Sequence, residues 1–270
     1  MALEQVGRQG LVLLGCGKMG GALLAGWLEA GLPARSVHVI EPHPSDWLRG
    51  TGVNLGGTLP DAPAVAVIAV KPQSMGESLP ALNRFGNGGT LVLSIAAGTT
   101  IATIESALGR QTPVVRAMPN TPAMVGRGIS ALCANAHVGV GQHRLARELM
   151  SAVGEVVDLE GEHQMDAVTA LSGSGPAYVF HLVEAMAAAG AAEGLPEALA
   201  MQLARATVSG AGELVRRSDE AVAQLRANVT SPGGTTAAGL AVLMDEATGF
   251  PPLLRRAIHA AAERGRELGR

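Results

Sequence analysis

Short runs of apolar residues alternate with longer, helix-length segments between residues 11 and 160. The runs consist mainly of Val, Ile, Leu and Ala without regular polar alternation, which is typical of parallel strands buried on both faces of a sheet. A helix is expected after the first run, over residues 19–31, with Gly31 as its end. The strands are expected at residues 11–15, 36–42, 64–70, 90–98, 113–120, 128–135 and 154–160. The pattern therefore predicts an α/β domain over residues 1–161, built on a doubly wound parallel sheet.

The second part of the chain has a different pattern. From about Glu162 the strand signals stop, and segments rich in Ala, Leu and Arg follow with helical spacing. Pro176 and Pro196 stand where two helices are expected to begin, a position that tolerates proline. The helices are expected at residues 176–193, 196–217, 235–247 and 252–268. Residues 162–270 should therefore form an all-α domain, and its apolar faces are extensive enough that a partner chain is expected to cover them.

Composition and charge narrow the classes of function. The chain of 270 residues has a formal net charge of −3 and a pI near 6.2, so no nucleic-acid partner is expected. No segment approaches the roughly 18 uncharged apolar residues of a membrane span. Cys16 and Cys133 show no pairing signature, which indicates reduced thiols and a cytoplasmic protein. The 7 histidines lack metal-ligand spacing, so no metal site is expected.

A glycine motif, GCGKMG at residues 15–20, follows the first expected strand and opens the first expected helix. Gly15 suits a tight turn, Gly17 the close approach of a pyrophosphate, and Gly20 close packing of helix on strand. Cys16 is expected to fill a small-residue position in this turn rather than to act as a nucleophile. The sequence therefore predicts a dinucleotide site that includes Gly15, Cys16, Gly17, Lys18, Met19 and Gly20.

Glu41 stands at the end of the second expected strand, about 20 residues after the glycine motif. A carboxylate there accepts hydrogen bonds from the adenosine ribose of NADH and repels the 2′-phosphate of NADPH. His43 and Ser45 can bind that phosphate and offset the repulsion. The cofactor is therefore expected to be NAD(P)H, with NADH favoured by Glu41 and NADPH not excluded. The alternative is that Glu41 is only a solvated charge at a strand end.

Two further turns follow buried strands at Ala69-Val70-Lys71-Pro72 and at Ser94–Gly98. Ligands of open parallel sheets collect at the carboxyl ends of strands, so both turns should border the cofactor. Lys71 is either an active-site base or, as we favour, a residue that binds cofactor or orders its turn. The small residues Ala96, Ala97 and Gly98 leave room for a nicotinamide ring.

Three motifs follow later in the chain. The turn MPNTP at residues 118–122 has two prolines and either shapes the site through Asn120 or only crosses between layers. The glycine-rich segment LSGSGP at residues 171–176 is expected to be a loop that opens a long helix, and Ser174 either binds substrate there or caps that helix. The loop SPGGTT at residues 231–236 also opens a helix, and its two glycines and two hydroxyls are more than a cap requires. Helix starts of this kind suit a small carboxylate.

The strings AVKPQ, SIAAG, RAMPNTPA, LSGSGPAYVF and SPGGTT, in this order and spacing, closely resemble pyrroline-5-carboxylate reductase, and the match runs from residue 11 to about 268. The resemblance implies a Rossmann domain followed by a helical dimerisation domain, hence a homodimer or a dimer-based oligomer. It also implies reduction of 1-pyrroline-5-carboxylate to L-proline with NAD(P)H, the last step of proline biosynthesis. Thr236 would be the catalytic group, with its hydroxyl near the ring nitrogen. The substrate-binding residues implied are Ser231, Gly233, Gly234, Thr235, Thr236, Asn120 and Ser174.

Two departures from the family pattern and three rival functions remain. Many members favour NADPH and have small polar or basic residues where this chain has Glu41-Pro42-His43-Pro44, and the crossover TLPDAP at residues 58–63 is shorter than the usual helix. A 3-hydroxyacid-type dehydrogenase would need a catalytic lysine on its first long helix after the sheet, and residues 176–217 contain no lysine. An NAD-binding redox sensor or a structural dimer would not need the SPGGTT loop.

Overall fold

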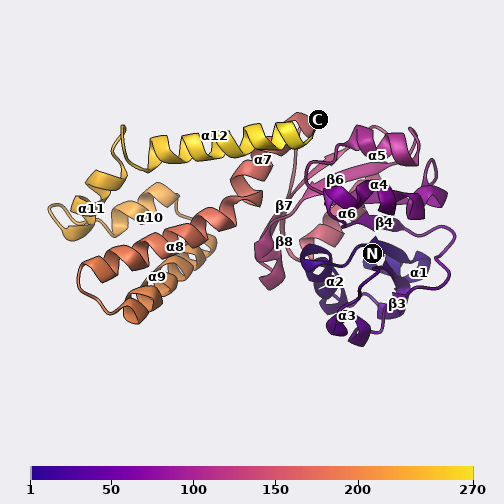
Figure 1. Cartoon of the computed structure of the whole chain (residues 1–270), viewed down its shortest axis with the longest axis horizontal. Coiled ribbons are helices and arrows are strands. Elements are labelled where there is room, and N and C mark those ends of the chain that lie inside the picture. Colours follow the sequence, from indigo (N-terminus) through magenta and orange to yellow (C-terminus); the bar gives the residue numbers. More distant parts are fainter. Residues whose placement is uncertain (1, 270) are drawn as a thin grey trace. The chain divides into compact units, whose positions relative to one another are not determined.

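The computed structural model describes residues 2–269 and divides the chain into two compact units (Figure 1). The sheet unit comprises residues 1–174 and 261–270, and the helical unit comprises residues 175–260. The sequence predicts a domain boundary between residues 161 and 162, where strand patterns give way to helical ones, and this boundary stays a prediction. The compact units divide later, at Ser174, because the intervening segment packs on the sheet: Met165 belongs to a buried core cluster with Val12 and Leu14.

The sheet unit is built on one eight-stranded sheet with the strand order β3-β2-β1-β4-β5-β6-β7-β8. The order reverses between β1 and β4, which is the point at which ligands bind in doubly wound folds. Each expected strand is present with shorter ends, and the short β3 was not expected. The strands are β1 Leu11–Leu14, β2 Val37–Ile40, β3 Asn54–Leu55, β4 Val65–Ile68, β5 Leu91–Ser94, β6 Val114–Met118, β7 Gly128–Ala134 and β8 Gly154–Asp158.

One pair of strands departs from the expected parallel arrangement. Strand β7 runs antiparallel to β6, with Met118 opposite Ala131, whereas every other neighbouring pair is parallel. The connection between them, residues 119–127, is shorter than the dozen or more residues that a parallel crossover requires. The expectation of a wholly parallel sheet is therefore wrong at this pair, because apolar runs do not encode strand direction.

Both faces of the sheet are covered, as the continuous apolar strands predicted. Leu11 and Leu13 of β1 face one core cluster, which includes Trp27, and Val12 and Leu14 face the other. In this part of the chain only one helix was expected by its residue range, and it corresponds to α2. Gly31, predicted to end that helix, lies just after it and has a positive φ. The helices of the sheet unit are α1 Ala2–Gln9, α2 Lys18–Glu29, α3 Asp46–Gly50, α4 Met75–Ser78, α5 Ile101–Leu108, α6 Val140–Ser151 and α7 Met165–Val168.

The helical unit contains the four expected helices, with ends shifted by at most a few residues, and one that was not expected, α10. These are α8 Gly175–Ala192, α9 Glu197–Arg217, α10 Val222–Asn228, α11 Thr235–Leu243 and α12 Phe250–Leu268, whose last residues, from Ala261, belong to the sheet unit. Helices α8 and α9 pack closely, since a Cβ on Gly190 would lie 3.4 Å from the Cβ of Ala200.

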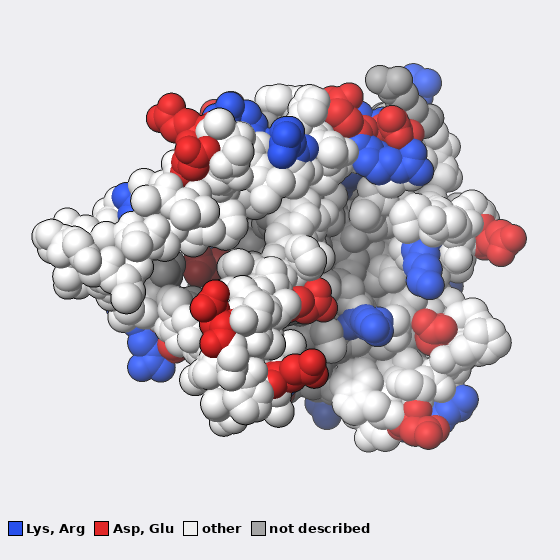
Figure 2. All heavy atoms as spheres, turned by 60° about the vertical axis from the view of Figure 1, so that its left-hand side comes forward, with Lys and Arg blue, Asp and Glu red and all other residues white. Residues whose placement is uncertain are grey.

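The helical unit has almost no core of its own. Within its described residues, only Ala187, Ala200 and Ala204 are buried apolar side chains. Large side chains such as Phe180 and Leu203 are 63% and 48% exposed. Figure 2 shows the uncharged side chains, in white, over broad areas between scattered charged ones. Within residues 2–269, no helix has the length and apolar character that crossing a bilayer requires.

Candidate functional site

The glycine turn between β1 and α2 has no room for side chains at two of its glycines. Gly15 has a φ of +87°, and a Cβ there would lie 2.8 Å from Cγ1 of Val70. A Cβ on Gly20 would lie 2.7 Å from the carbonyl oxygen of Gly15, so α2 packs directly on the turn. Gly17 faces open space, and α2 begins there without a side-chain cap. The first N–H groups of α2 are therefore available to an anion, and the cradle fits a dinucleotide pyrophosphate.

Glu41 is anchored to this turn rather than solvated at a strand end. Its Oε2 accepts a 2.8 Å hydrogen bond from the backbone N–H of Cys16, and its Oε1 accepts a 3.1 Å bond from the N–H of His43. The carboxylate is thereby held between the glycine turn and the end of β2. Its remaining lone pairs can accept hydrogen bonds from ribose hydroxyls.

A cavity of about 590 Å³ lies beside Glu41 and extends along α2. Small residues of α2 form part of its lining, together with Trp47, which is 48% exposed, and Met124. Burial, and to a lesser extent the charge of Glu41, raises the pKa of the Cys16 thiol to about 11. The thiol is therefore protonated at neutral pH and is a poor nucleophile. The lining residues are Cys16, Gly17, Lys18, Gly21, Ala22, Ala25, Glu41, His43, Ser45, Trp47 and Met124.

The two later cofactor turns follow adjacent parallel strands and so lie at the same edge of the sheet as the glycine turn. Ala69 and Val70 are half-buried and contact Gly15, whereas Lys71 and Pro72 are exposed. In the second turn Ala96 is buried, Ala97 is exposed, and Gly98 has a φ of +72°. The structure therefore groups these predicted cofactor residues at one edge. Within residues 2–269, no group of three His, Cys, Asp or Glu side chains is arranged for a metal ion.

The segment predicted as a glycine-rich loop before the long helix is instead helical, so that expectation is wrong. Residues Thr169–Gly173 form a π turn that continues α7 and leads through Ser174 into α8. The backbone N–H of Ser174 donates to the carbonyl of Thr169 at 2.8 Å, so it is not a free donor at a helix start. Propensities do not distinguish a wide helical turn from a loop, and the packing partners of this turn are distant in sequence.

Asn120 is buried, with 9% exposure, and both polar atoms of its side chain are bound to backbone groups. Its Nδ2 donates to the carbonyl of Ser172 at 3.2 Å, and its Oδ1 accepts from the N–H of Ile129 at 3.0 Å. The turn around it, from Thr121 to Val125, is a short 3₁₀ helix. The two-proline motif therefore joins β6, β7 and the π turn inside the sheet unit.

The SPGGTT loop lies in the helical unit and ends at the start of α11, as predicted. Gly233 has a φ of +71°, and the N–H of Gly234 donates to the carbonyl of Ser231 at 3.0 Å. Helix α11 begins at Thr235 with no side-chain cap. Among the described residues, no hydrogen bond is formed by the exposed hydroxyl of Thr236. This helix start therefore offers backbone N–H groups and hydroxyls to a ligand.

Sequence reasoning missed an ion pair in the sheet unit. Arg116 on β6 is 5% exposed, and its Nη1 lies 2.7 Å from Oε1 of Glu162. The same oxygen accepts the N–H of Ile101, at the start of α5, at 2.9 Å. The signal was an arginine within the apolar strand run, since a buried guanidinium requires a partner.

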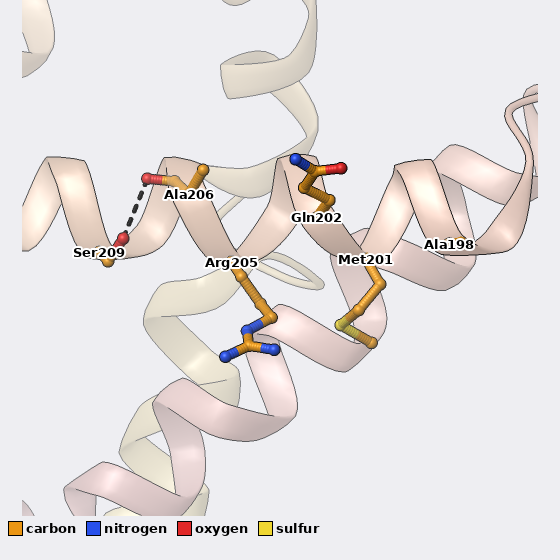
Figure 3. Close-up of a pocket in the computed structure, with 6 residues that line it drawn as sticks. All are labelled: Ala198, Met201, Gln202, Arg205, Ala206 and Ser209. Atoms are coloured by element: carbon orange, nitrogen blue, oxygen red, sulfur yellow. Dashed lines mark hydrogen bonds between the residues drawn. The ribbon is translucent and has the colours of Figure 1, made fainter.

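A second hollow, of about 470 Å³, lies on α9 and contains none of the predicted site residues. Figure 3 shows its lining along one helix, where the hydroxyl of Ser209 donates to the carbonyl of Ala206 at 3.2 Å. Met201, Gln202 and Arg205 project between small residues. This hollow belongs to the largely uncovered surface of the helical unit.

Comparison with known proteins gives matches over nearly the whole chain. The family model for pyrroline-5-carboxylate reductase dimerisation matches residues 162–268, and that for coenzyme F420-dependent NADP oxidoreductase matches residues 10–98. Pyrroline-5-carboxylate reductase of Pseudomonas aeruginosa is 40% identical over 264 residues, 96% of either chain. The solved structure of a pyrroline-5-carboxylate reductase from Coxiella burnetii gives a TM-score of 0.89 at 34% identity, over 97% of this chain and 99% of that one. The Plasmodium falciparum pyrroline carboxylate reductase, with NADP bound, gives 0.82 at 32% identity, again over 97% and 99%.

Proposed function

Because this chain belongs to the pyrroline-5-carboxylate reductase family, we propose that it reduces 1-pyrroline-5-carboxylate to L-proline, the last step of proline biosynthesis. The observation that carries the proposal is the uncapped, uncharged start of α11 in a chain that also has a dinucleotide cradle. A small carboxylate is the ligand that such a helix start attracts. Neither a redox sensor nor a structural dimer requires such a helix start.

The reaction needs little acid–base chemistry from the protein. NAD(P)H supplies the hydride, and the imine carbon of the substrate receives it. The ring nitrogen of a cyclic imine is a near-neutral base, so the iminium ion forms without a strong protein acid. The chain then has to hold the two reacting carbons at near-attack distance and to exclude water.

In the SPGGTT loop, backbone groups and a side chain bind different parts of the substrate. The N–H groups at the start of α11 bind the carboxylate, with Ser231, Gly233, Gly234 and Thr235 forming the loop. The hydroxyl of Thr236 hydrogen-bonds the ring nitrogen and so fixes which carbon faces the nicotinamide. Support comes from the unpaired state of this hydroxyl, because a residue that served only to cap the helix would be bonded to its backbone. Ser174 is a further substrate contact in this proposal.

The cofactor is NADH by preference, with NADPH accepted. Two backbone N–H groups hold the Glu41 carboxylate beside the ribose position, where it meets the 2′-phosphate of NADPH at close range. Lys18, His43 and Ser45 line the same cavity and offset part of the repulsion. The Ser45 hydroxyl accepts from the N–H of Leu48, which leaves its own proton free for a phosphate. A preference of roughly 1–2 kcal/mol, or about 5- to 30-fold, is expected.

The functional form is a homodimer made by the helical unit. Many of its large apolar side chains are exposed in the single chain, and the buried apolar side chains among its described residues are three alanines. A second copy offers the matching surface, because closed two-fold pairing is the commonest way to bury such faces. The match of residues 162–268 to a dimerisation family supports this assignment.

A single assay tests the proposed function. Purified protein, NADH and 1-pyrroline-5-carboxylate are mixed, the nicotinamide absorbance is followed, and proline is identified by chromatography. We expect cofactor oxidation with one proline formed per NADH. A matched reaction supplies NAD⁺ and a series of 3-hydroxy acids, the substrates of the rival dehydrogenase. Turnover of a 3-hydroxy acid without turnover of the imine would overturn the proposal.

A further inference from the structure

Three segments of the sheet unit meet at one carboxylate, that of Glu162. Its Oε1 accepts from Nη1 of Arg116 on β6 at 2.7 Å and from the N–H of Ile101, the first residue of α5, at 2.9 Å. These partners lie 46 and 61 residues away in the sequence. A carboxylate at the N-terminal end of a helix is favourable, because it satisfies a free N–H group and interacts with the positive end of the helix dipole. Glu162 therefore ties the start of α5 to β6.

Arg116 stands beside the point at which the turn after β5 begins. In the register of the sheet it pairs with Ser94, the last residue of β5. It is 5% exposed, so the side chain that holds the carboxylate is itself fixed by packing. Ile101 directly follows the other end of the same turn, residues 95–100. The ion pair of Arg116 with Glu162 therefore links the two ends of this turn.

The middle of the turn has few hydrogen bonds of its own. The N–H of Ile95 donates to the carbonyl of Ile68 on β4 at 2.9 Å, and the N–H of Ala96 donates to the hydroxyl of Ser94 at 3.3 Å. Among the described residues, no hydrogen bond is formed by the backbone N–H groups of residues 97–100. The conformation of this part of the turn therefore depends on how its two ends are held.

The same turn contains Ala96, Ala97 and Gly98, the small residues that leave room for a nicotinamide ring. We propose that Glu162 is a positioning residue for the cofactor: with Arg116 it fixes the turn of residues 95–100 in the conformation against which the nicotinamide half of NAD(P)H binds. Glu162 acts through the turn and does not touch the cofactor. This rests on the proposed assignment of residues 96–98 to the cofactor site.

Loss of the carboxylate is expected to affect one half of the cofactor only. The glycine turn and Glu41, which hold the pyrophosphate and the adenosine ribose in the proposed function, are bonded to each other without Glu162. The turn after β5 would instead have to be ordered when the nicotinamide binds. Fixing the backbone of one residue changes an equilibrium constant by about 5- to 30-fold. NADH should therefore bind more weakly, whereas ADP-ribose, which lacks the nicotinamide ring, should bind as before.

The test uses two variants of Glu162 and a matched control. Glu162→Ala removes both bonds of the carboxylate, whereas Glu162→Gln has the same length and keeps an oxygen acceptor for Ile101. The control is Glu105→Ala on α5, where Oε1 of the native residue accepts from Nδ2 of Asn135 at 2.8 Å. Both alanine variants remove a part-buried carboxylate of the sheet unit, but only Glu162 holds the start of α5.

Full-length proteins are compared without substrate by the Kd for NADH, the Kd for ADP-ribose and the melting temperature. For Glu162→Ala we expect the Kd for NADH to rise about 5- to 30-fold and the Kd for ADP-ribose to stay within about twofold. NADH affinity should largely return in Glu162→Gln and be unaffected in Glu105→Ala. A purely structural role would lower the melting temperature without separating the two ligands. An unchanged Kd for NADH in Glu162→Ala, or an equal rise for ADP-ribose or in Glu105→Ala, overturns the proposal.

A further variant keeps the result decisive if Glu162→Ala does not fold. Glu162→Asp retains the charge beside Arg116 but is one methylene shorter, so it cannot also reach Ile101, and it should weaken NADH binding selectively. Turnover of 1-pyrroline-5-carboxylate is measured separately. If the variants differ in NADH binding as expected but the wild type does not reduce the imine, the proposed function fails and the positioning role stands. A wild type that binds neither NADH nor ADP-ribose overturns the cofactor assignment and this proposal with it.

Discussion

The sheet unit and the helical unit bury their apolar residues in opposite ways. In the sheet unit, every residue of β1, β4 and β5 is buried, and two core clusters cover the two faces of the sheet. In the described part of the helical unit, the buried apolar side chains are three alanines, whereas side chains as large as Phe180 are exposed. Apolar residues therefore form buried clusters in one region and remain largely exposed in the other. The contrast teaches that apolar residues alone do not give a region its own core, and it agrees with the match of residues 162–268 to a dimerisation family.

The two regions also differ in how they prepare a ligand site. In the sheet unit two of the proposed cofactor residues are already bonded to each other, since the backbone N–H of Cys16 donates to the carboxylate of Glu41. In the helical unit the loop before α11 presents donors that have no partner among the described residues. The first candidate site is organised by its own backbone, whereas the second has free donors that, under the proposed function, bind a carboxylate.

The largest effect is expected from Phe180→Asp on α8, which places a charge on the uncovered apolar surface. Losing the burial of a phenylalanine and burying a carboxylate in its place should cost about 4 kcal/mol or more, which raises the dimer dissociation constant about a thousandfold. Light scattering coupled to gel filtration should show a monomer with reduced helical signal in circular dichroism. The control is Val140→Asp in the sheet unit, where an equally apolar side chain is 90% exposed. A stable, active monomer would contradict the comparison.

Thr236→Ala tests the proposed substrate site of the helical unit. Losing a hydrogen bond to a charged group costs roughly 1.5–3 kcal/mol, so kcat/KM should fall about 10- to 150-fold. The melting temperature should hardly change, because Thr236 caps nothing in the structure, and NADH affinity should be unaffected. Thr207→Ala on α9 makes the same chemical change elsewhere in the unit and should leave kinetics normal. A lowered melting point with normal kinetics would show that Thr236 is only a structural residue.

Glu162→Gln removes one charge of the buried ion pair in the sheet unit, for comparison with an exposed ion pair in the helical unit. The variant leaves the guanidinium of Arg116 buried without its charged partner and weakens the bond to the N–H of Ile101, so unfolding should be easier by about 2 kcal/mol. Urea denaturation at pH 7 measures this.

The comparison variant in the helical unit is Glu213→Gln. Hydrogen bonds from Arg216 and Arg217 lower the pKa of Glu213 from 4.5 to about 2. Because the folded pKa is depressed, any stabilisation is present above pH 4.5 and is lost as the pH falls towards 2. Solvent screens this exposed group, so no measurable change is expected at pH 7. Equal losses in the Glu162 and Glu213 variants would remove the distinction between the two units.

Glu41→Ser should have the smallest effect, on cofactor choice alone. Removing the carboxylate abolishes the repulsion of the 2′-phosphate and the bond to the ribose, so the ratio of kcat/KM for NADH over NADPH should fall about 5- to 30-fold. Glu41→Gln keeps acceptors for the N–H groups of Cys16 and His43 and separates the effect of charge from that of turn geometry. An unchanged ratio in both variants would mean that Glu41 serves only to order the glycine turn.

Much of the fold was predictable from local patterns. The strand positions, α2 with its end at Gly31, and the start of α11 after Gly234 were expected from apolar runs, glycines and prolines. These signals are local, because a tight turn or a helix end is decided by the conformational range of the residues that form it. Strand direction is different, and the antiparallel β7 follows from the short connection after Met118 rather than from the composition of the strand.

The candidate site was predicted in part. The residues of the glycine turn and Glu41 were identified by spacing, but not the bond from Cys16 N–H that holds the carboxylate. Asn120 was recognised as unusual, yet both of its partners are contributed by other segments. An apolar strand that contains Arg116 signals a buried partner without saying that it is Glu162.

The sequence by itself determined the family, the positions of seven strands and of the long helices, and the glycine-rich turns that we propose bind ligands, because each depends on short-range conformational preference or on motifs of a few residues. Tertiary structure alone decided that the segment predicted as a loop is helical, with a π turn at Thr169–Gly173, and that Asn120 supplies a donor to this turn. It also decided that the helical unit leaves its large side chains uncovered. These features arise from contacts between residues far apart in the chain, and such contacts are fixed only when the elements pack.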